Sequence, residues 1–196
     1  MATVVLFHHA LGLTDGVVRL AEEIRSGGHT VHTPDLYDGR TFGDLAEGVE
    51  FAKSLGFGTV ADRGAHAVES LPTDLFYVGI SLGVLPAQRL AQTRRGARGA
   101  VLISACFHSS EFGPSWPEGV RLQVHGMEAD PEFANEWDLP AARALVEEAS
   151  EGELFLYRGD QHLFVDRSLP SFDENAAALL VRRLLTFLEG GTKRGP

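Results

Sequence analysis

Cysteine is nearly absent from this sequence, and long hydrophobic runs are absent altogether. The single cysteine among 196 residues, Cys106, excludes a disulfide framework within the chain and suits a reducing cytoplasm. It follows the apolar run 100–103, so it is either a buried small hydrophobic residue or a reactive thiol. No run approaches the ~20 apolar residues that cross a bilayer, and no basic segment leads into an apolar one at the start. We therefore expect a cytoplasmic protein with no membrane partner.

Basic residues are also scarce. The chain has 17 Lys and Arg against 27 Asp and Glu, and its formal net charge is -10. Such a charge repels nucleic acid and anionic membranes unless a local basic patch overrides it. The one basic cluster, Arg94, Arg95 and Arg98, follows a predicted helix, where cations favour the negative end of the helix dipole. We therefore expect no nucleic-acid partner.

Apolar strand-like runs alternate with helical patterns along the chain. This alternation indicates an α/β fold in which a mostly parallel sheet carries helices on both faces. Strands are expected at 3–7, 29–33, 75–80, 99–103, 121–124 and 153–157, and helices at 16–26, 84–93, 139–149 and 174–188. The last helix could be capped by Asp173, whereas residues 38–57 are only weakly periodic and receive no assignment. We expect one domain over residues 1–191 and a frayed tail over 192–196.

One serine lies between two glycines where a buried strand gives way to a helix, at Gly79-Ile80-Ser81-Leu82-Gly83. This is the form of a nucleophile elbow, in which a strained turn lifts the serine from the strand end and close packing leaves no room for side chains at the glycines. With 22 glycines in the chain the pattern alone is weak, but the flanking strand and helix give it the required context. An ordinary strand-to-helix turn is the alternative.

In sheets of this kind ligands bind outside the carboxyl ends of the strands. His162 follows the sixth predicted strand in a polar turn, where it could act as a general base or simply be solvated. Asp130 follows the fifth strand and is the preferred acid, with Glu128 and Asp138 as alternatives. Serine, acid and histidine then come in the chain order that α/β-hydrolases use.

The first predicted strand leads to the same edge through His8-His9-Ala10-Leu11-Gly12. Neighbouring residues of an extended strand point to opposite faces, and no carboxylate-histidine motif accompanies the two histidines, so we expect no metal site. The loop would instead form the mouth of the site. There the backbone amides of Ala10 and Leu82 would form an oxyanion hole.

Four stretches, 4–12, 28–37, 79–83 and 157–164, together resemble the dienelactone hydrolase family of α/β-hydrolases. The more specific parts are the run Pro34-Asp35-Leu36-Tyr37 and the histidine followed two residues later by Phe164. The resemblance implies a small hydrolase with about six parallel strands and no large cap domain, which cleaves esters or lactones without a cofactor. Carried over by position, Ser81 is the nucleophile, Asp130 the acid and His162 the base.

The chain departs from the dienelactone hydrolases proper in three respects. Their nucleophile is cysteine where this chain has Ser81, and they have a second glycine at the position of Val84. A glutamate that interacts with their resting thiol is replaced by His9, and an arginine that holds the substrate carboxylate is replaced by Asp166. This reversal of charge disfavours a carboxylate-bearing substrate, so we expect a neutral ester, lactone or thioester.

A substrate pocket is expected to draw on loop residues, namely His9, Leu11, Phe107, Trp116 and Phe164. The aromatic residues suit equally well the packing of loops onto the body. Two other functions remain open: a catalytically weak binding or scaffold protein with this fold, and a phosphate or nucleotide binder. The second lacks the expected glycine-rich motifs. A monomer or a small homo-oligomer is expected on general grounds.

Overall fold

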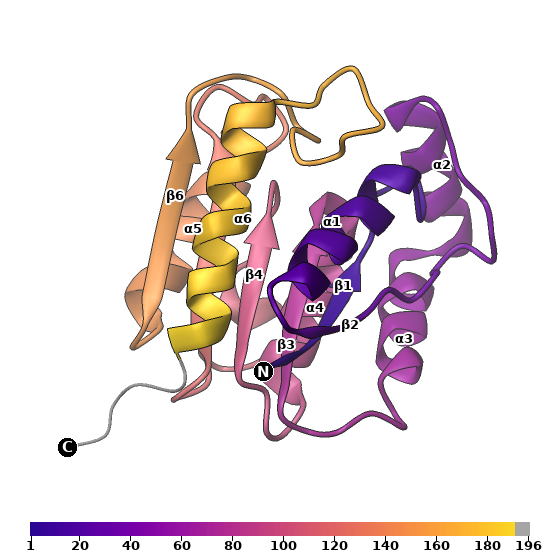
Figure 1. The fold of residues 1–196 in the computed structure, drawn as a ribbon. Coiled ribbons are helices and arrows are strands. Elements are labelled where there is room, and N and C mark those ends of the chain that lie inside the picture. The colour runs from indigo at the N-terminus through magenta and orange to yellow at the C-terminus, as the bar shows by residue number, and fades with distance from the viewer. Residues whose placement is uncertain (191–196) are drawn as a thin grey trace.

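The fold is one parallel sheet between two layers of helices (Figure 1). The computed structural model describes residues 1–190, so the predicted frayed tail lies outside the described residues. Six strands pair in the order β2-β1-β3-β4-β5-β6, every neighbouring pair being parallel. The predicted α/β class, the six-stranded sheet and the absence of a large cap domain within residues 1–190 are confirmed.

The strands are β1 (Thr3–Phe7), β2 (Thr30–His32), β3 (Leu75–Ile80), β4 (Gly99–Ile103), β5 (Arg121–Met127) and β6 (Gly152–Tyr157). The helices are α1 (Asp15–Ser26), α2 (Leu45–Leu55), α3 (Phe57–Ala67), α4 (Val84–Thr93), α5 (Asp138–Glu148) and α6 (Glu174–Glu189). Two short 3-10 turns, η1 (Ser81–Gly83) and η2 (Ser109–Glu111), complete the described chain. No described helix is long and apolar enough to cross a membrane.

Side chains of each strand alternate between two hydrophobic cores because successive residues point to opposite faces of the sheet. Along β1, Val4 and Leu6 belong to the core that includes residues of α1 and α6, whereas Val5 and Phe7 belong to the core that includes residues of α2 to α5. Buried on both faces, the central strands read as continuous apolar runs, which is why the sequence located them well.

Helix α2 lies in the segment 38–57 that the sequence left unassigned, and α3, which was not predicted either, follows directly after it. Asp44 caps α2 by accepting hydrogen bonds from the Ala46 and Glu47 amides. The fully buried residues of α2 are the small Gly48 and Ala52, whereas the larger Phe51 and Leu55 are only partly buried against the core. A Cβ atom at Gly48 would lie 2.2 Å from the carbonyl oxygen of Ala10. The weak periodicity thus reflects a helix that packs by backbone contact.

β5 extends to Met127, beyond the predicted end at residue 124, because the histidine that follows Val124 is satisfied inside the sheet. His125 is completely buried, and its Nε2 and Nδ1 lie 3.2 Å from Gln123 Oε1 and 2.8 Å from Tyr157 Oη. Since the amide oxygen only accepts, Nε2 carries the proton and Nδ1 accepts from the tyrosine hydroxyl. Burial, aided by the nearby Arg183 charge, lowers the pKa of His125 to about 3.

The strand arrowheads point to the top of Figure 1, where the loop after β6 and the start of α2 lie. The carboxyl ends of all six strands therefore meet at one edge, as a parallel sheet requires.

We expect His125→Gln to flatten the acid side of the stability curve. Because the folded-state pKa of His125 lies below its ordinary value of 6.5, its neutral form stabilises the fold above that pH, and this stability is lost as the pH falls toward 3. Between pH 7 and pH 5 the wild type should lose about 2 kcal/mol through this group, and the variant should not. Urea unfolding at both pH values measures the difference, and parallel losses in the two proteins would contradict the expectation.

Candidate active site

Ser81 lies in a strained turn directly after β3. Its φ angle is +50°, in the left-handed region that few residues other than glycine adopt. A Cβ atom at Gly79 would lie 2.4 Å from the Gly83 carbonyl oxygen, and one at Gly83 would lie 2.3 Å from the Phe7 carbonyl oxygen. Both glycines of the motif are therefore required by close backbone contact. The turn has the geometry of a nucleophile elbow.

Three side chains from three different strand ends form a continuous hydrogen-bonded chain. Ser81 Oγ lies 2.8 Å from His162 Nε2, and His162 Nδ1 lies 2.8 Å from Asp130 Oδ2. A carboxylate only accepts, so Nδ1 carries the imidazole proton and Nε2 accepts from the serine hydroxyl. Asp130 is completely buried, whereas the His162 side chain is 14% exposed. His162, which is partly open to solvent, can therefore take the hydroxyl proton of Ser81 while the buried Asp130 holds its ring.

Backbone contacts fix the carboxylate of Asp130. Its Oδ1 atom accepts from the Glu132 amide at 2.9 Å, which leaves Oδ2 for the histidine. Of the two alternative acids, Glu128 is exposed, and Asp138 accepts instead from the amide of Cys106 and the side chain of Asn135. Asp130 is thus the one of the three that contacts His162.

The loop after β1 makes a tight turn beside the elbow. The Gly12 amide donates to the His9 carbonyl oxygen at 3.0 Å, and the Leu11 amide donates to His9 Nδ1 at 3.2 Å. Ala10, which lies between His9 and Leu11, is 2% exposed, and within residues 1–190 its amide has no hydrogen-bond acceptor. Leu82 follows the serine directly in the first turn of η1. The two residues whose amides the sequence predicts for an oxyanion hole thus lie in adjacent turns.

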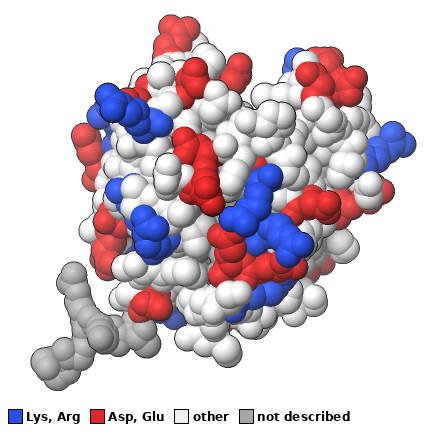
Figure 2. Space-filling view, turned by 45° about the horizontal axis from the view of Figure 1, so that its top comes forward, with Lys and Arg blue, Asp and Glu red and all other residues white. Residues whose placement is uncertain are grey.

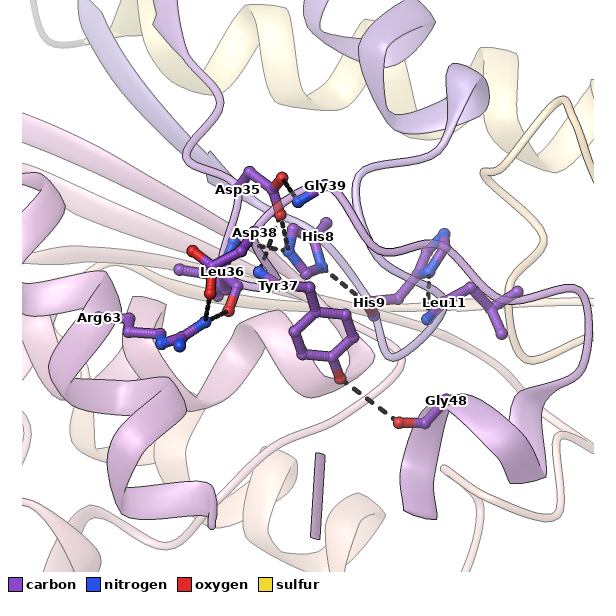
Figure 3. Close-up of polar contacts among 10 residues, drawn as sticks. All are labelled: His8, His9, Leu11, Asp35, Leu36, Tyr37, Asp38, Gly39, Gly48 and Arg63. Atoms are coloured by element: carbon purple, nitrogen blue, oxygen red, sulfur yellow. Dashed lines mark hydrogen bonds and ion pairs between the residues drawn. The ribbon is translucent and has the colours of Figure 1, made fainter. Parts of the chain in front are cut away.

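His8 fastens this turn to the loop after β2 (Figure 3). Its Nε2 accepts from the Leu36 amide at 3.0 Å and its Nδ1 donates to the His9 carbonyl oxygen at 2.8 Å. Asp35 closes the same loop by accepting from the Tyr37 amide at 2.8 Å. Burial lowers the pKa of His8 to about 4, so its ring is neutral near pH 7. The Pro34-Asp35-Leu36-Tyr37 run therefore supports the turn at residues 9–12.

Residues from the loops surround a hollow of about 400 Å³ beside His162. The lining residues are Leu11, Gly43, Asp44, Leu45, Gln161, His162, Leu163, Leu169, Pro170 and Ser171. Five of the other nine are apolar, and Asp44 is the only one of the nine with a charged side chain. Figure 2, in which the top of the molecule comes forward, shows a notch between two lobes with Asp and Glu on both. A positively charged anchor for a substrate carboxylate is not among the described lining residues.

Of the residues expected to line a pocket, Leu11 lies at this hollow. His9 is completely buried against Asp166, and Phe164 is completely buried against Tyr157. Trp116 is buried and donates its indole N–H to the Val120 carbonyl oxygen, while Phe107 is half-buried against Phe112. These four side chains pack the loops onto the body and are absent from the lining.

Leu45, Leu169 and Pro170 also line the hollow, although the sequence did not single out these individual residues. Leu45 is the first residue of α2, and the other two lie in an irregular segment between β6 and α6. Composition alone carries no signal for such positions.

Two other candidate chemistries find no support in the structure. Burial, with the nearby Asp138 charge, raises the pKa of the Cys106 thiol far above its usual range, as expected of a small core residue. Within residues 1–190, no cluster of three or more His, Cys, Asp or Glu side chains could hold a metal ion.

Known proteins of the same fold support the architecture. A dienelactone hydrolase-like promiscuous phosphotriesterase, P91, from metagenomic libraries superposes with a TM-score of 0.73 at 16% identity, over 97% of this chain and 86% of its own. The structure called m3DLH has a TM-score of 0.69 at 21% identity, over 95% and 86%. The monoacylglycerol lipase of Paleococcus ferrophilus has a TM-score of 0.68 at 15% identity, over 97% and 95%.

No curated protein sequence matches the chain. The model of the dienelactone hydrolase family matches residues 1–190, nearly the whole chain. These comparisons, together with the elbow and the parallel sheet, support a hydrolase. The chain belongs to the dienelactone hydrolase family.

Proposed function

We propose that the protein is a serine hydrolase that cleaves a small neutral carboxylic ester, lactone or thioester through an acyl-enzyme. The observation that carries this proposal is the chain of hydrogen bonds from Ser81 through His162 to Asp130, which holds the imidazole in the tautomer that a general base needs.

The proposed reaction uses only these side chains and the two amides. His162 takes the hydroxyl proton of Ser81 as Oγ attacks the acyl carbon, and Asp130 stabilises the imidazolium that forms. The amides of Ala10 and Leu82 stabilise the tetrahedral oxyanion. The imidazolium then gives its proton to the leaving oxygen or sulfur, and water, activated by the same histidine, releases the acyl group.

The hollow supports a neutral substrate. Its described lining is largely apolar and includes one carboxylate, Asp44, at the capped start of α2. Two structural neighbours, a phosphotriesterase and a monoacylglycerol lipase, are named for substrates that are uncharged esters. We further infer that the reaction needs no cofactor and no nucleic-acid or membrane partner, and that the enzyme acts in the cytoplasm as a monomer or small homo-oligomer.

We expect a fluorophosphonate to label the native protein once and to leave Ser81→Ala unlabelled, as measured by intact mass. Ser104→Ala is the matched control. Ser104 follows β4 as Ser81 follows β3, since Ile80 pairs with Ile103, and its φ angle is also positive at +59°. Its Oγ is buried without a hydrogen-bond partner in the described chain, so nothing activates it. Ser104→Ala should label like the wild type.

No adduct on the folded native protein would contradict the serine-hydrolase proposal and favour the catalytically weak binding protein.

We expect a neutral p-nitrophenyl ester to have at least tenfold higher kcat/KM than one of similar size that ends in a carboxylate, because the substrate charge would face Asp44 across an apolar hollow. Asp44→Asn keeps an oxygen to cap α2 but removes the charge. The ratio of kcat/KM for the neutral ester to kcat/KM for the anionic ester should therefore fall roughly threefold at low salt. A preference for the anionic ester would show that the site binds a carboxylate.

A further inference from the structure

A second buried histidine and carboxylate lie beside the proposed site. His9 Nε2 is 2.7 Å from Asp166 Oδ2, and both side chains are completely buried. His9 is in the turn after β1, and Asp166 comes four residues after His162. The contact therefore ties the loop that carries the proposed oxyanion amide to the loop that carries the proposed base.

The hydrogen bonds of His9 define its tautomer. The Leu11 amide donates to Nδ1, so Nε2 must carry the proton and donate to Asp166. Through Nδ1 the ring therefore holds the backbone amide of Leu11, the residue after Ala10. Through Nε2 the ring is itself held by Asp166. Rotation of this ring would move the neighbouring Ala10 amide, which has no hydrogen-bond acceptor within the described chain.

Asp166 is in turn held by donors from two elements. Thr14, the cap of α1, donates its hydroxyl to Oδ2, and Ser168 donates its amide and hydroxyl to Oδ1. Burial by itself would raise the pKa of Asp166, but the hydrogen bonds from His9, Ser168 and Thr14 outweigh it and lower the pKa to about 2, so the carboxylate stays ionised near pH 7. A Cβ atom at Gly16 would lie 1.6 Å from Oδ1, so the carboxylate sits against bare backbone.

A buried ion with four donors is a costly way to achieve stability alone, since well-packed apolar side chains often serve as well. The position of this carboxylate suggests a further role, because its contact with His9 joins the loop after β1 to the loop after β6. We propose that Asp166, acting through His9, is a positioning residue that sets the Ala10 amide relative to Ser81 and His162. This inference rests on the proposed serine-hydrolase function and adds to it how the oxyanion donor is held.

The test compares two substitutions of His9 in the full-length protein. His9→Leu removes both hydrogen bonds and should lower kcat about 10²-fold, the effect of losing one oxyanion donor. His9→Gln keeps a donor for Asp166 but leaves the Leu11 amide without the ring acceptor. Its kcat should fall about tenfold, which is a smaller loss than that of His9→Leu. In both variants KM should stay within threefold and the pH dependence of kcat should not shift, because the Asp130–His162 contact is untouched.

His125→Leu and His125→Gln are the matched controls. His125 is also a completely buried histidine with two hydrogen bonds, but it lies within β5. These variants should lose stability in urea unfolding and keep wild-type kcat under conditions where circular dichroism shows them folded. If His9→Leu does not fold, His9→Gln alone decides the question.

Two failures are distinguishable. A folded wild type that neither labels with fluorophosphonate nor cleaves esters overturns the proposed function and this inference with it. A reactive wild type with folded His9→Gln at wild-type kcat overturns the positioning role and leaves the proposed function intact. Loss of kcat in the His125 controls equal to that in the His9 variants also overturns the positioning role, because the effect would then follow stability.

Discussion

Bare backbone contact around the carboxyl end of β1 is the constraint on which the site depends. A Cβ atom at Gly83 would lie 2.3 Å from the Phe7 carbonyl oxygen, and one at Gly48 would lie 2.2 Å from that of Ala10. The elbow and α2 thus press on the same short segment with no side chain between. The distance from this segment to the elbow and to α2 is set by backbone atoms, which cannot move aside as a side chain can by changing rotamer. The amides of the loop after β1 therefore have fixed positions.

Two histidine–carboxylate pairs, Asp130–His162 and Asp166–His9, share one local chemistry and differ in what the second ring nitrogen meets. For His162 that nitrogen faces the hydroxyl of Ser81, and the ring is partly open to solvent. For His9 it faces a backbone amide in a fully enclosed position. Because of these different neighbours, the Asp130–His162 pair can accept a proton from Ser81, whereas the Asp166–His9 pair can only hold the turn after β1.

The sequence predicted what depends on local periodicity and short motifs. Three strands, β1, β3 and β4, have the predicted bounds, and Ser81, Asp130 and His162 meet as expected. Features that depend on tertiary contact were not predictable in this way: α2 packs through Gly48, and Trp116 and Phe164 turn inward rather than toward the hollow. The His9–Asp166 contact spans 157 residues. Its one signal was that both positions depart together from the family pattern.

The long spans of these contacts also bear on how the site comes into being. Ser81 meets His162 across 81 residues and His9 meets Asp166 across 157, in a sheet whose neighbouring strands are all parallel. Contacts between distant residues form late because loop closure must precede them. A growing chain therefore carries the serine turn without its base over the 81 residues that separate Ser81 from His162, and reactivity would arrive only when the loop after β6 docks.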